Sequence, residues 1–538
     1  MFRIGIDFDN TIACYEEAFS EVAASLDIVI DPGVYGKSDV KRCIVNQPNG
    51  EFKWQRLQGK VYGKYMALAR CYAGVHEFIY LARERGHQVF VVSHKSEYGH
   101  FDEELVPLRV AAIAWLNQFG FLGEQNHLIS HDHVFFEPTR ADKIARICKL
   151  KCTHFIDDLR EVFDAPGFPS NIVKILFTPH EVEYSDNGID GVSSWRGITR
   201  RLFGTWTADE MCAALQRELH DIKITNISRV EGRGNSRIFR VSGDDEKFYI
   251  LKCYPDRQLD KRPRMQTEFS ASQALFRLGF LVPEPMFFDS RFDWALYGNI
   301  PGREADPDEN FVEKAAAFLE NIYQAGRSTE QFSNFGLASE ACLSGEEIIS
   351  QLKRRLDKLS AVRALLLEKF IDEDFTPLLL MVSASAKRIT GEKFVETLPK
   401  AHQVPSPSDF GAHNAISTPE QKIFFIDFEY FGWDDPVKLV SDFYWHPAMS
   451  LSDSLRARWL IRCLPIFGND YFFELRLKAY LPLFGLRWCL ILLNEFLPTG
   501  LERRDYANSS GLSSPAETLK HQLSKAKRML ELVKRLPP

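Results

Sequence analysis

Two aspartates stand at the end of the first apolar segment of the chain. Asp7 and Asp9 follow Ile4 and Ile6, whose spacing indicates a short buried strand. Residues two apart in a strand point to the same side, so both carboxylates can serve one site. One carboxylate of such a pair can attack a phosphorus centre while the other handles the proton of the leaving group. The spacing predicts a phosphoryl-transfer site, and a solvated turn is the alternative interpretation.

More polar residues follow at the ends of later predicted elements. One short apolar run, residues 88–92, reads as a buried parallel strand and ends in Ser93. A later strand ends in Asp157 and Asp158, and Lys143 opens a helical pattern before it. Open α/β sheets bind their ligands at the ends of strands. We therefore expect these side chains to lie near the first aspartate pair.

This order of motifs resembles the haloacid dehalogenase-like (HAD) phosphatase superfamily over roughly residues 1–200. The resemblance implies a Rossmannoid parallel sheet and hydrolysis that depends on Mg²⁺, for which carboxylate oxygens are suitable ligands. It implies Asp7 as nucleophile, Asp9 as general acid/base, Thr11, Ser93 and Lys143 as phosphate binders, and Asp7, Asp9, Asp157 and Asp158 as metal ligands. Structural alternatives are a helix cap for Ser93, a surface helix position for Lys143, and a loop start for the later aspartates.

The chain between Thr11 and Val89 is longer than one crossover helix requires. The excess, about residues 31–70, stands where many HAD enzymes carry a small cap. Residues 53–65 mix cations with aromatics, which would suit an anionic, partly ring-shaped substrate. A solvated basic helix packed through Trp54 and Tyr62 is the alternative.

A second set of motifs lies further along the chain. Gly232, Gly234 and Ser236 belong to a small-residue turn whose backbone N–H groups can approach phosphate oxygens. The next predicted strand delivers Lys252, and Glu268 lies on the helical pattern that follows. Kinases pair a strand lysine with a helix glutamate to hold ATP phosphates. These residues predict a nucleotide-binding site.

The strongest signal for a kinase is Asp409 with Asn414 five residues later, and then Asp427 after a short apolar strand. Phosphoryl transfer needs a carboxylate to orient the attacking hydroxyl, and oxygen ligands for Mg²⁺ beside ATP. The set resembles the aminoglycoside phosphotransferase/choline kinase family over about residues 222–538. The resemblance implies Asp409 as catalytic base, Asn414 and Asp427 as metal ligands, and ATP as phosphate donor.

One departure from that family concerns the residues before the aspartate. The family usually has a histidine there, whereas this chain has Pro407 and Ser408. A degenerate kinase fold that binds nucleotide without transferring phosphate is therefore the alternative. The acids that follow, Asp434, Asp435 and Asp442, are expected to brace the catalytic loop.

The chain of 538 residues is too long for one hydrophobic core. We expect a mixed α/β and α+β fold. The first part is an HAD-like domain at 1–205 with the cap at 31–70, followed by a linker at 206–221. The second part is a bilobal kinase-like domain with an N-lobe at 222–300 and a helical C-lobe at 301–538.

The composition of the chain indicates which classes of binding partner and which cellular compartment to expect. The formal net charge of −7, without a long basic run, argues against nucleic acid as the main partner. Ten scattered cysteines favour a reducing cytoplasm, and the N-terminus enters a strand directly, which predicts no signal peptide. The apolar segment 481–497 contains Arg487, Asn494 and Glu495, so we expect a buried helix and no membrane span.

Together the two sites predict a bifunctional phosphatase and kinase. Both activities at one position would only consume ATP, so the fusion favours action on different hydroxyls of one metabolite or at different steps of one route. A phosphorylated sugar or polyol is the favoured small-molecule substrate, and surface polysaccharide precursors are an analogy from metabolism. Two alternatives stay open: a single-activity enzyme whose other domain regulates, and a polynucleotide end-processing kinase/phosphatase. The sequence contains neither the Walker-type loop nor the basic run expected for many enzymes of the last class.

Overall fold

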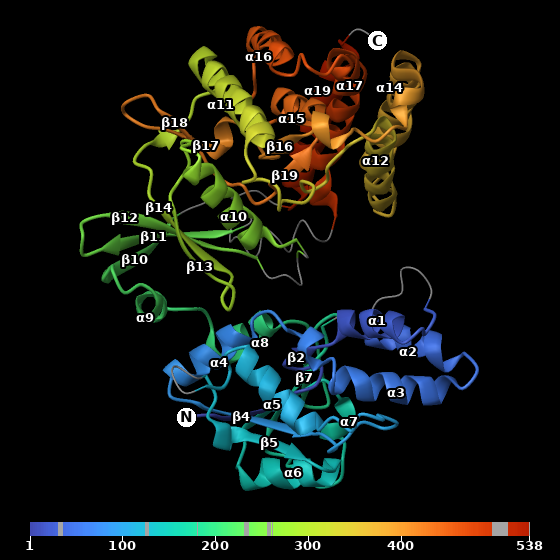
Figure 1. Cartoon of the computed structure of the whole chain (residues 1–538), viewed down its shortest axis with the longest axis vertical. Coiled ribbons are helices and arrows are strands. Elements are labelled where there is room, and N and C mark those ends of the chain that lie inside the picture. The colour runs from blue at the N-terminus through green and yellow to red at the C-terminus, as the bar shows by residue number, and fades with distance from the viewer. Residues whose placement is uncertain are drawn as a thin grey trace. The chain divides into compact units, whose positions relative to one another are not determined.

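The computed structural model of the protein, shown in Figure 1, describes residues 1–30, 36–123, 128–179, 181–230, 236–255, 260, 262–497 and 515–536. The chain forms two compact units. Unit 1 contains Met1–Glu218, and unit 2 contains Leu219–Pro255 and Arg262–Pro538.

Unit 1 is built on a seven-stranded sheet of order β5-β4-β1-β6-β7-β9-β8. Neighbouring strands are parallel except β8 and β9, which form an antiparallel edge. The strands are β1 (Arg3–Ile6), β4 (Gln88–His94), β5 (Val134–Glu137), β6 (His154–Asp157), β7 (Val173–Phe177), β8 (Tyr184–Asp186) and β9 (Ile189–Val192). A separate short pair joins β2 (Ala13–Cys14) to β3 (Arg70–Cys71). The parallel sheet expected for this part of the chain is present.

The two faces of this sheet bury different hydrophobic clusters. Val89 and Val91 of β4 belong to one cluster, whereas Phe90 and Val92 belong to the other. This alternation follows from the two-residue period of a strand. A strand buried on both faces reads as a continuous apolar run, which explains why β4 was recognisable in the sequence.

Unit 1 also contains the α-helices labelled α1 to α9 in Figure 1. They are α1 (Glu16–Ser25), α2 (Lys37–Val45), α3 (Gly50–Tyr62), α4 (Val75–Glu84), α5 (Leu108–Gln118), α6 (Arg140–Lys149), α7 (Arg160–Phe163), α8 (Trp195–Phe203) and α9 (Ala208–Glu218). The region expected to form a cap contains α2 and α3. The segment expected to be a linker contains α9, and Glu210 on that helix accepts a hydrogen bond from Arg85 at 2.7 Å.

Unit 2 begins with an antiparallel sheet of order β10-β11-β12-β14-β13. Its strands are β10 (Ile224–Val230), β11 (Arg237–Gly243), β12 (Phe248–Cys253), β13 (Pro285–Asp289) and β14 (Trp294–Gly298). Helix α10 (Arg264–Arg277) packs against β13 and β14.

The rest of unit 2 is mainly helical and contains the largest hydrophobic cluster of the protein. Its α-helices are α11 (Glu309–Ser328), α12 (Gly345–Ser360), α13 (Leu365–Lys369), α14 (Thr376–Thr390), α15 (Pro436–Trp445), α16 (Asp453–Ile466), α17 (Phe473–Leu492) and α19 (Pro515–Lys534). The short strands are β15 (Arg303–Glu304), β16 (Val404–Ser406), β17 (Ala415–Ser417), β18 (Ile423–Phe425) and β19 (Gly432–Asp434). The kinase-like division into a sheet followed by a helical part is therefore present.

Helix α17, with the turn that follows it, is long and apolar enough to cross a membrane. No other helix in the described parts of the chain passes that test. Its most apolar stretch is 67% buried within the protein, and α17 packs against α12, α14, α15 and α19. Burial of this kind is typical of a core helix, which agrees with the interpretation of residues 481–497 from the sequence.

Candidate functional site

The ends of β1, β4 and β6 meet at one edge of the sheet in unit 1. Ile6 pairs with Val91 of β4 and with Ile156 of β6. Asp7 follows Ile6, and its backbone N–H donates to the Ile156 carbonyl at 2.9 Å. Asp157 is the last residue of β6. The parallel register thus brings Asp7 and Asp157 together.

Lys143 connects these two carboxylates. It lies in the first turn of α6, which begins at the cap residue Thr139, whose Oγ1 accepts the N–H of Asp142 at 3.1 Å. The Lys143 Nζ is 2.5 Å from Asp7 Oδ1 and 2.6 Å from Asp157 Oδ2. All three side chains are buried. Lys143 is therefore part of an internal ion cluster, and the alternative of a surface helix position is wrong.

The same place gathers carboxylates that could hold a metal ion. Oxygens of Asp7, Asp157 and Asp158 lie within 4.8 Å of one another. Burial raises the pKa of Asp7 to about 7 despite the nearby lysine. Burial, reinforced by Asp7 and Asp157, raises the pKa of Asp158 to about 8. Such a cluster is stabilised by a divalent cation, and its hard oxygens fit Mg²⁺.

Asp9 is held by two residues that the sequence interpretation missed. Lys95 Nζ is 2.9 Å from both carboxylate oxygens of Asp9, and Tyr15 donates its hydroxyl hydrogen to Oδ1 at 2.5 Å. Lys95 is buried and follows Ser93 by two residues, at the end of β4. The side chain of Asp9 therefore contacts Lys95 and Tyr15 and lies outside the group of Asp7, Asp157 and Asp158. Its role as a metal ligand stays a prediction.

Thr11 and Ser93 are both buried at this edge of the sheet. The Thr11 hydroxyl donates to Asp158 Oδ1 at 3.4 Å, and its carbonyl accepts from the Trp195 indole at 2.9 Å. Ser93 lies inside strand β4, so the alternative of a helix cap is wrong.

The cap region offers different cations from those the sequence suggested. Trp54 is buried against Phe19, and Lys60 forms a buried ion pair with Asp102 at 2.8 Å. This agrees with the alternative interpretation of α3 as a packed helix. Lys37 of α2 is the cap cation near the site. Burial lowers its pKa, but Tyr62 and then the carboxylates of Asp158 and Asp9 outweigh that effect and raise it.

Unit 2 places a second ion cluster between β12, α10 and the segment after β18. Lys252 Nζ is 2.6 Å from Glu268 Oε2 and 2.6 Å from Asp427 Oδ1. Burial raises the pKa of Glu268 to about 7, and Lys252 counteracts that rise. Arg264 Nη1 lies 2.7 Å from Glu429 Oε1. The oxygens of Glu268, Asp427 and Glu429 lie within 4.8 Å of one another, with Lys252 and Arg264 as their cations. Asp427 is the carboxylate of this cluster that lies beside Asn414 and offers a hard oxygen suited to Mg²⁺.

Of the small-residue turn predicted to bind phosphate, only Ser236 belongs to the described residues. Gly232 and Gly234 lie outside the described residues. Ser236 precedes β11, and its buried Oγ has no hydrogen-bond partner within the described chain. A phosphate oxygen could satisfy that hydroxyl.

Asp409 and Asn414 lie in a loop between β16 and β17. The Asn414 amide donates to the Asp409 carbonyl at 2.9 Å, and its own carbonyl accepts the Ile426 N–H at 3.0 Å. Strands β17 and β18 pair directly beyond Asn414, so Asn414 and Asp427 stand at the same end of a hairpin. Asp427 has a φ of +67° and Ser408 a φ of +66°, a backbone conformation that is uncommon for non-glycine residues.

Two histidines absent from the sequence interpretation contact Asp409. Its Oδ1 lies 3.0 Å from His413 Nε2 and 3.2 Å from His446 Nε2. Burial alone would raise the pKa of Asp409, but the two imidazole rings beside it hold that pKa well below its usual range. No local pattern links His446 to Asp409, because 36 residues separate them in the chain.

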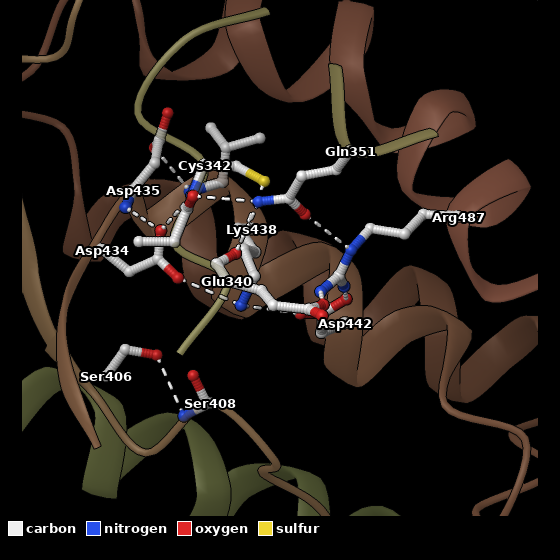
Figure 2. Close-up of polar contacts among 12 residues, drawn as sticks. Glu340, Cys342, Gln351, Ser406, Ser408, Asp434, Asp435, Lys438, Asp442 and Arg487 are labelled. Atoms are coloured by element: carbon white, nitrogen blue, oxygen red, sulfur yellow. Dashed lines mark hydrogen bonds and ion pairs between the residues drawn. The ribbon is translucent and has the colours of Figure 1, made fainter. Parts of the chain in front are cut away.

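A buried polar network supports the strands beside this loop (Figure 2). Asp434 at the end of β19 accepts the Cys342 N–H at 3.0 Å. Lys438 of α15 lies 3.0 Å from Asp434 and 3.1 Å from Asp442. Arg487 of α17 lies 3.3 Å from Asp442 Oδ1. Because β19 pairs with β16, this network fixes the strand that leads into the loop.

Most of unit 2 matches a known protein family. Residues 226–477 match the family described as "Phosphotransferase enzyme family" (APH). This stretch contains Lys252, Glu268, Asp409, Asn414 and Asp427, so the C-terminal part of the chain contains a phosphotransferase-type, kinase-like domain. The match begins at residue 226, and the HAD resemblance of unit 1 stays a prediction.

Other comparisons gave the following results. No curated protein matches the chain. Among solved structures, choline kinase LicA from Streptococcus pneumoniae is 14% identical with a TM-score of 0.39, covering 60% of this chain and 98% of that one. A choline/ethanolamine kinase family protein from Mesorhizobium loti is 15% identical with a TM-score of 0.38, covering 60% and 94%. Spectinomycin phosphotransferase APH(9)-Ia is 12% identical with a TM-score of 0.42, covering 62% and 99%.

Proposed function

We propose that the chain is a bifunctional enzyme. Residues 222–538 transfer phosphate from ATP to a hydroxyl of a small molecule, and residues 1–205, with the cap at 31–70, hydrolyse a phosphomonoester. The kinase proposal is supported by a family match that spans every described residue of the predicted site. The phosphatase proposal rests on one observation, the bridging of Asp7 and Asp157 by Lys143 at the strand ends.

In the kinase site, Lys252 binds ATP phosphates and Glu268 holds the lysine in place. Lys252 exchanges its contact with Asp427 for phosphate oxygens when ATP binds. Asp409 orients the attacking hydroxyl through Oδ2 and accepts its proton. Asn414 and Asp427 supply oxygens for Mg²⁺, which when bound neutralises phosphate charge. The turn of Gly232, Gly234 and Ser236 contacts the phosphates through its backbone.

In the phosphatase site, Asp7 attacks phosphorus and the bond from phosphorus to the leaving oxygen breaks. Asp9 gives its proton to that oxygen, then takes a proton from the water that attacks the aspartyl-phosphate. Inorganic phosphate leaves and Asp7 is regenerated. Lys143, Thr11 and Ser93 surround the transferred group. The carboxylates of Asp7, Asp157 and Asp158 would hold Mg²⁺, which supplies charge neutralisation at the phosphate.

A phosphorylated sugar or polyol is the proposed substrate of this pair of sites. The support is the fusion of two opposed activities, together with the cations Lys37 and Lys95 beside Asp9. All ten cysteines are free thiols, which supports the proposal of a reducing cytoplasm.

The test separates the two sites by substitution. Asp7→Asn should abolish phosphate release from p-nitrophenyl phosphate and leave ATP turnover unchanged. Asp409→Asn should slow transfer while calorimetry still shows Mg–ATP binding, whereas Asp427→Asn should weaken that binding. Asp164→Asn, at an exposed position, is the matched control. Unchanged phosphate release in Asp7→Asn would overturn the phosphatase assignment.

A further inference from the structure

Two histidines lie against a single oxygen of Asp409. An ionised carboxylate can only accept, so His413 presents Nε2–H to Asp409 Oδ1, and His446 Nε2 lies 3.2 Å from the same oxygen. His446 Nδ1 accepts the Ala448 N–H at 3.3 Å, which places the ring hydrogen on Nε2 in the neutral form. Oδ2 of Asp409 receives no hydrogen bond from the described residues. The arrangement occupies one oxygen and leaves the other for an attacking hydroxyl.

The ring geometry distinguishes this arrangement from a metal site. The ligand atoms of Asp409, His413 and His446 lie within 4.8 Å of one another, close enough for a metal by distance alone. However, the imidazole rings are stacked, with centroids 3.8 Å apart and planes 6° from parallel. The lone pair of an imidazole nitrogen lies in its ring plane, so one metal ion would have to lie in both planes. Nearly parallel stacked planes do not meet at such a point, and an N–H bond also lies in its ring plane. Only one ring can therefore point straight at the oxygen: His413 donates to Asp409, and His446 stacks on the face of His413.

Neighbouring residues fix both rings. A Cβ at Gly411 would lie 2.9 Å from the His413 ring and 2.7 Å from Met449 Sδ, so only glycine leaves room for them. The edge of Trp488 contacts His446, with ring centroids 4.6 Å apart. The Trp488 indole donates to Asp442 at 2.9 Å, which ties His446 to the buried network of Figure 2.

We propose that His413 and His446 are positioning residues that hold Asp409 in the geometry for phosphoryl transfer. They contact an aspartate that follows Pro407 and Ser408, so no histidine stands directly before it in the chain. The proposal rests on the proposed kinase function of unit 2.

The experiment measures ADP release from Mg–ATP with water as the probe acceptor, in the full-length protein. His446→Ala and His413→Ala should each lower kcat by about 10- to 100-fold, because a small displacement of a catalytic group is costly. The Kd of Mg–ATP should not change, since neither ring binds nucleotide. His413→Gln should recover part of kcat, because its amide N–H can also donate to Asp409. His521→Ala, at an exposed position of α19, is the control.

The outcomes separate this proposal from the kinase function. Wild-type ADP release with unchanged kcat in both alanine variants would overturn the positioning role alone. Equal loss in the alanine and glutamine variants, with normal thermal unfolding, would also overturn it. Binding of Zn²⁺ to the wild type that is lost in His446→Ala would show a metal site instead. No ADP release from the wild type would overturn the kinase function and the positioning role together.

Discussion

Lys95 Nζ lies 2.9 Å from each carboxylate oxygen of Asp9. Asp9 follows strand β1 and Lys95 follows strand β4 of the unit 1 sheet. A symmetric contact of this kind fixes the orientation of the carboxylate. The second aspartate of the motif is therefore positioned by a cation that directly follows a different strand, β4. This contact has a direct consequence for the proposed phosphatase.

Replacing Lys95 with Met keeps the length of the side chain and removes its charge. We expect kcat for phosphate release to fall by about 10²-fold, which is typical for loss of a positioned proton-transfer group. ATP turnover by unit 2 should not change. Lys64→Met is the matched control, because Lys64 pairs with Glu104 at a half-exposed position. Steady-state phosphate release is the measurement, and equal rates in the two variants would contradict a role for Lys95.

The raised pKa of Asp158 predicts how the stability of unit 1 depends on pH. Its folded value of about 8 exceeds the unfolded value of about 3.9. A carboxyl group shifted upward contributes stability that is fully present below the unfolded pKa and is lost as pH rises through about 8. Unfolding temperatures should therefore fall between pH 5 and pH 8, and Asp158→Asn should flatten that fall.

Mg²⁺ should reverse this loss, because its ligands must be deprotonated. As the pH is raised toward 7, we expect the apparent affinity of unit 1 for Mg²⁺ to increase by up to about tenfold for each pH unit. Differential scanning fluorimetry with and without Mg²⁺ measures the effect, with Asp164→Asn as control. Equal stabilisation by Mg²⁺ at pH 5 and pH 8 would contradict the proposed carboxylate site.

Arg487 provides a test of the buried network in unit 2. Its guanidinium contacts Asp442 and Glu340, and Arg487→Met would leave the buried Asp442 with only Lys438 as a cation. Loss of one partner from a buried pair costs about 3–5 kcal/mol. Arg354→Met, at an exposed pair with Glu347, should cost about 0–1 kcal/mol. Urea unfolding measures the free energy of unfolding of both variants, and the transition of unit 2 is identified as the one that shifts when Mg–ATP is added. A similar loss of stability in the two variants would contradict the structural role of Arg487.

The residues that the sequence predicted share a simple physical signal. Asp7, Ser93 and Asp157 each stand at or near the end of a continuous apolar run, and strands of that kind are parallel and buried on both faces. Once the strands are assigned, the common edge of a parallel sheet brings their ends together. Lys252 and Glu268 were found in the same way, from the strand and helix that carry them.

The residues that the sequence did not reveal depend on tertiary contacts. Lys95 is one lysine among many, and only the turn after β4 brings it to Asp9. His446 reaches Asp409 because α15 ends beside the catalytic loop. Lys60 shows the reverse case, because the sequence suggested it as a cation for an anionic substrate. Its charge is instead neutralised by Asp102, which follows 42 residues later in the chain. Periodicity carries no information about such pairs.

The last prediction concerns the order of the two reactions. If the kinase phosphorylates a sugar or polyol phosphate, its product is a bisphosphate, and the phosphatase then removes the original phosphate. Lys37 and Lys95 favour such a product, because cations beside the phosphatase site attract the more highly charged ligand. With ATP, the wild type should convert a starting monophosphate into an isomeric monophosphate.

The variant Asp7→Asn should instead accumulate the bisphosphate, because it keeps the kinase and lacks the nucleophile. Mass spectrometry separates the bisphosphate from both monophosphates, and ³¹P NMR distinguishes the two isomers. Asp409→Asn is the control and should leave the starting compound unchanged. The proposed order is wrong if the kinase accepts only unphosphorylated acceptors, or if the phosphatase fails to hydrolyse the kinase product, since the two sites would then act on separate substrates.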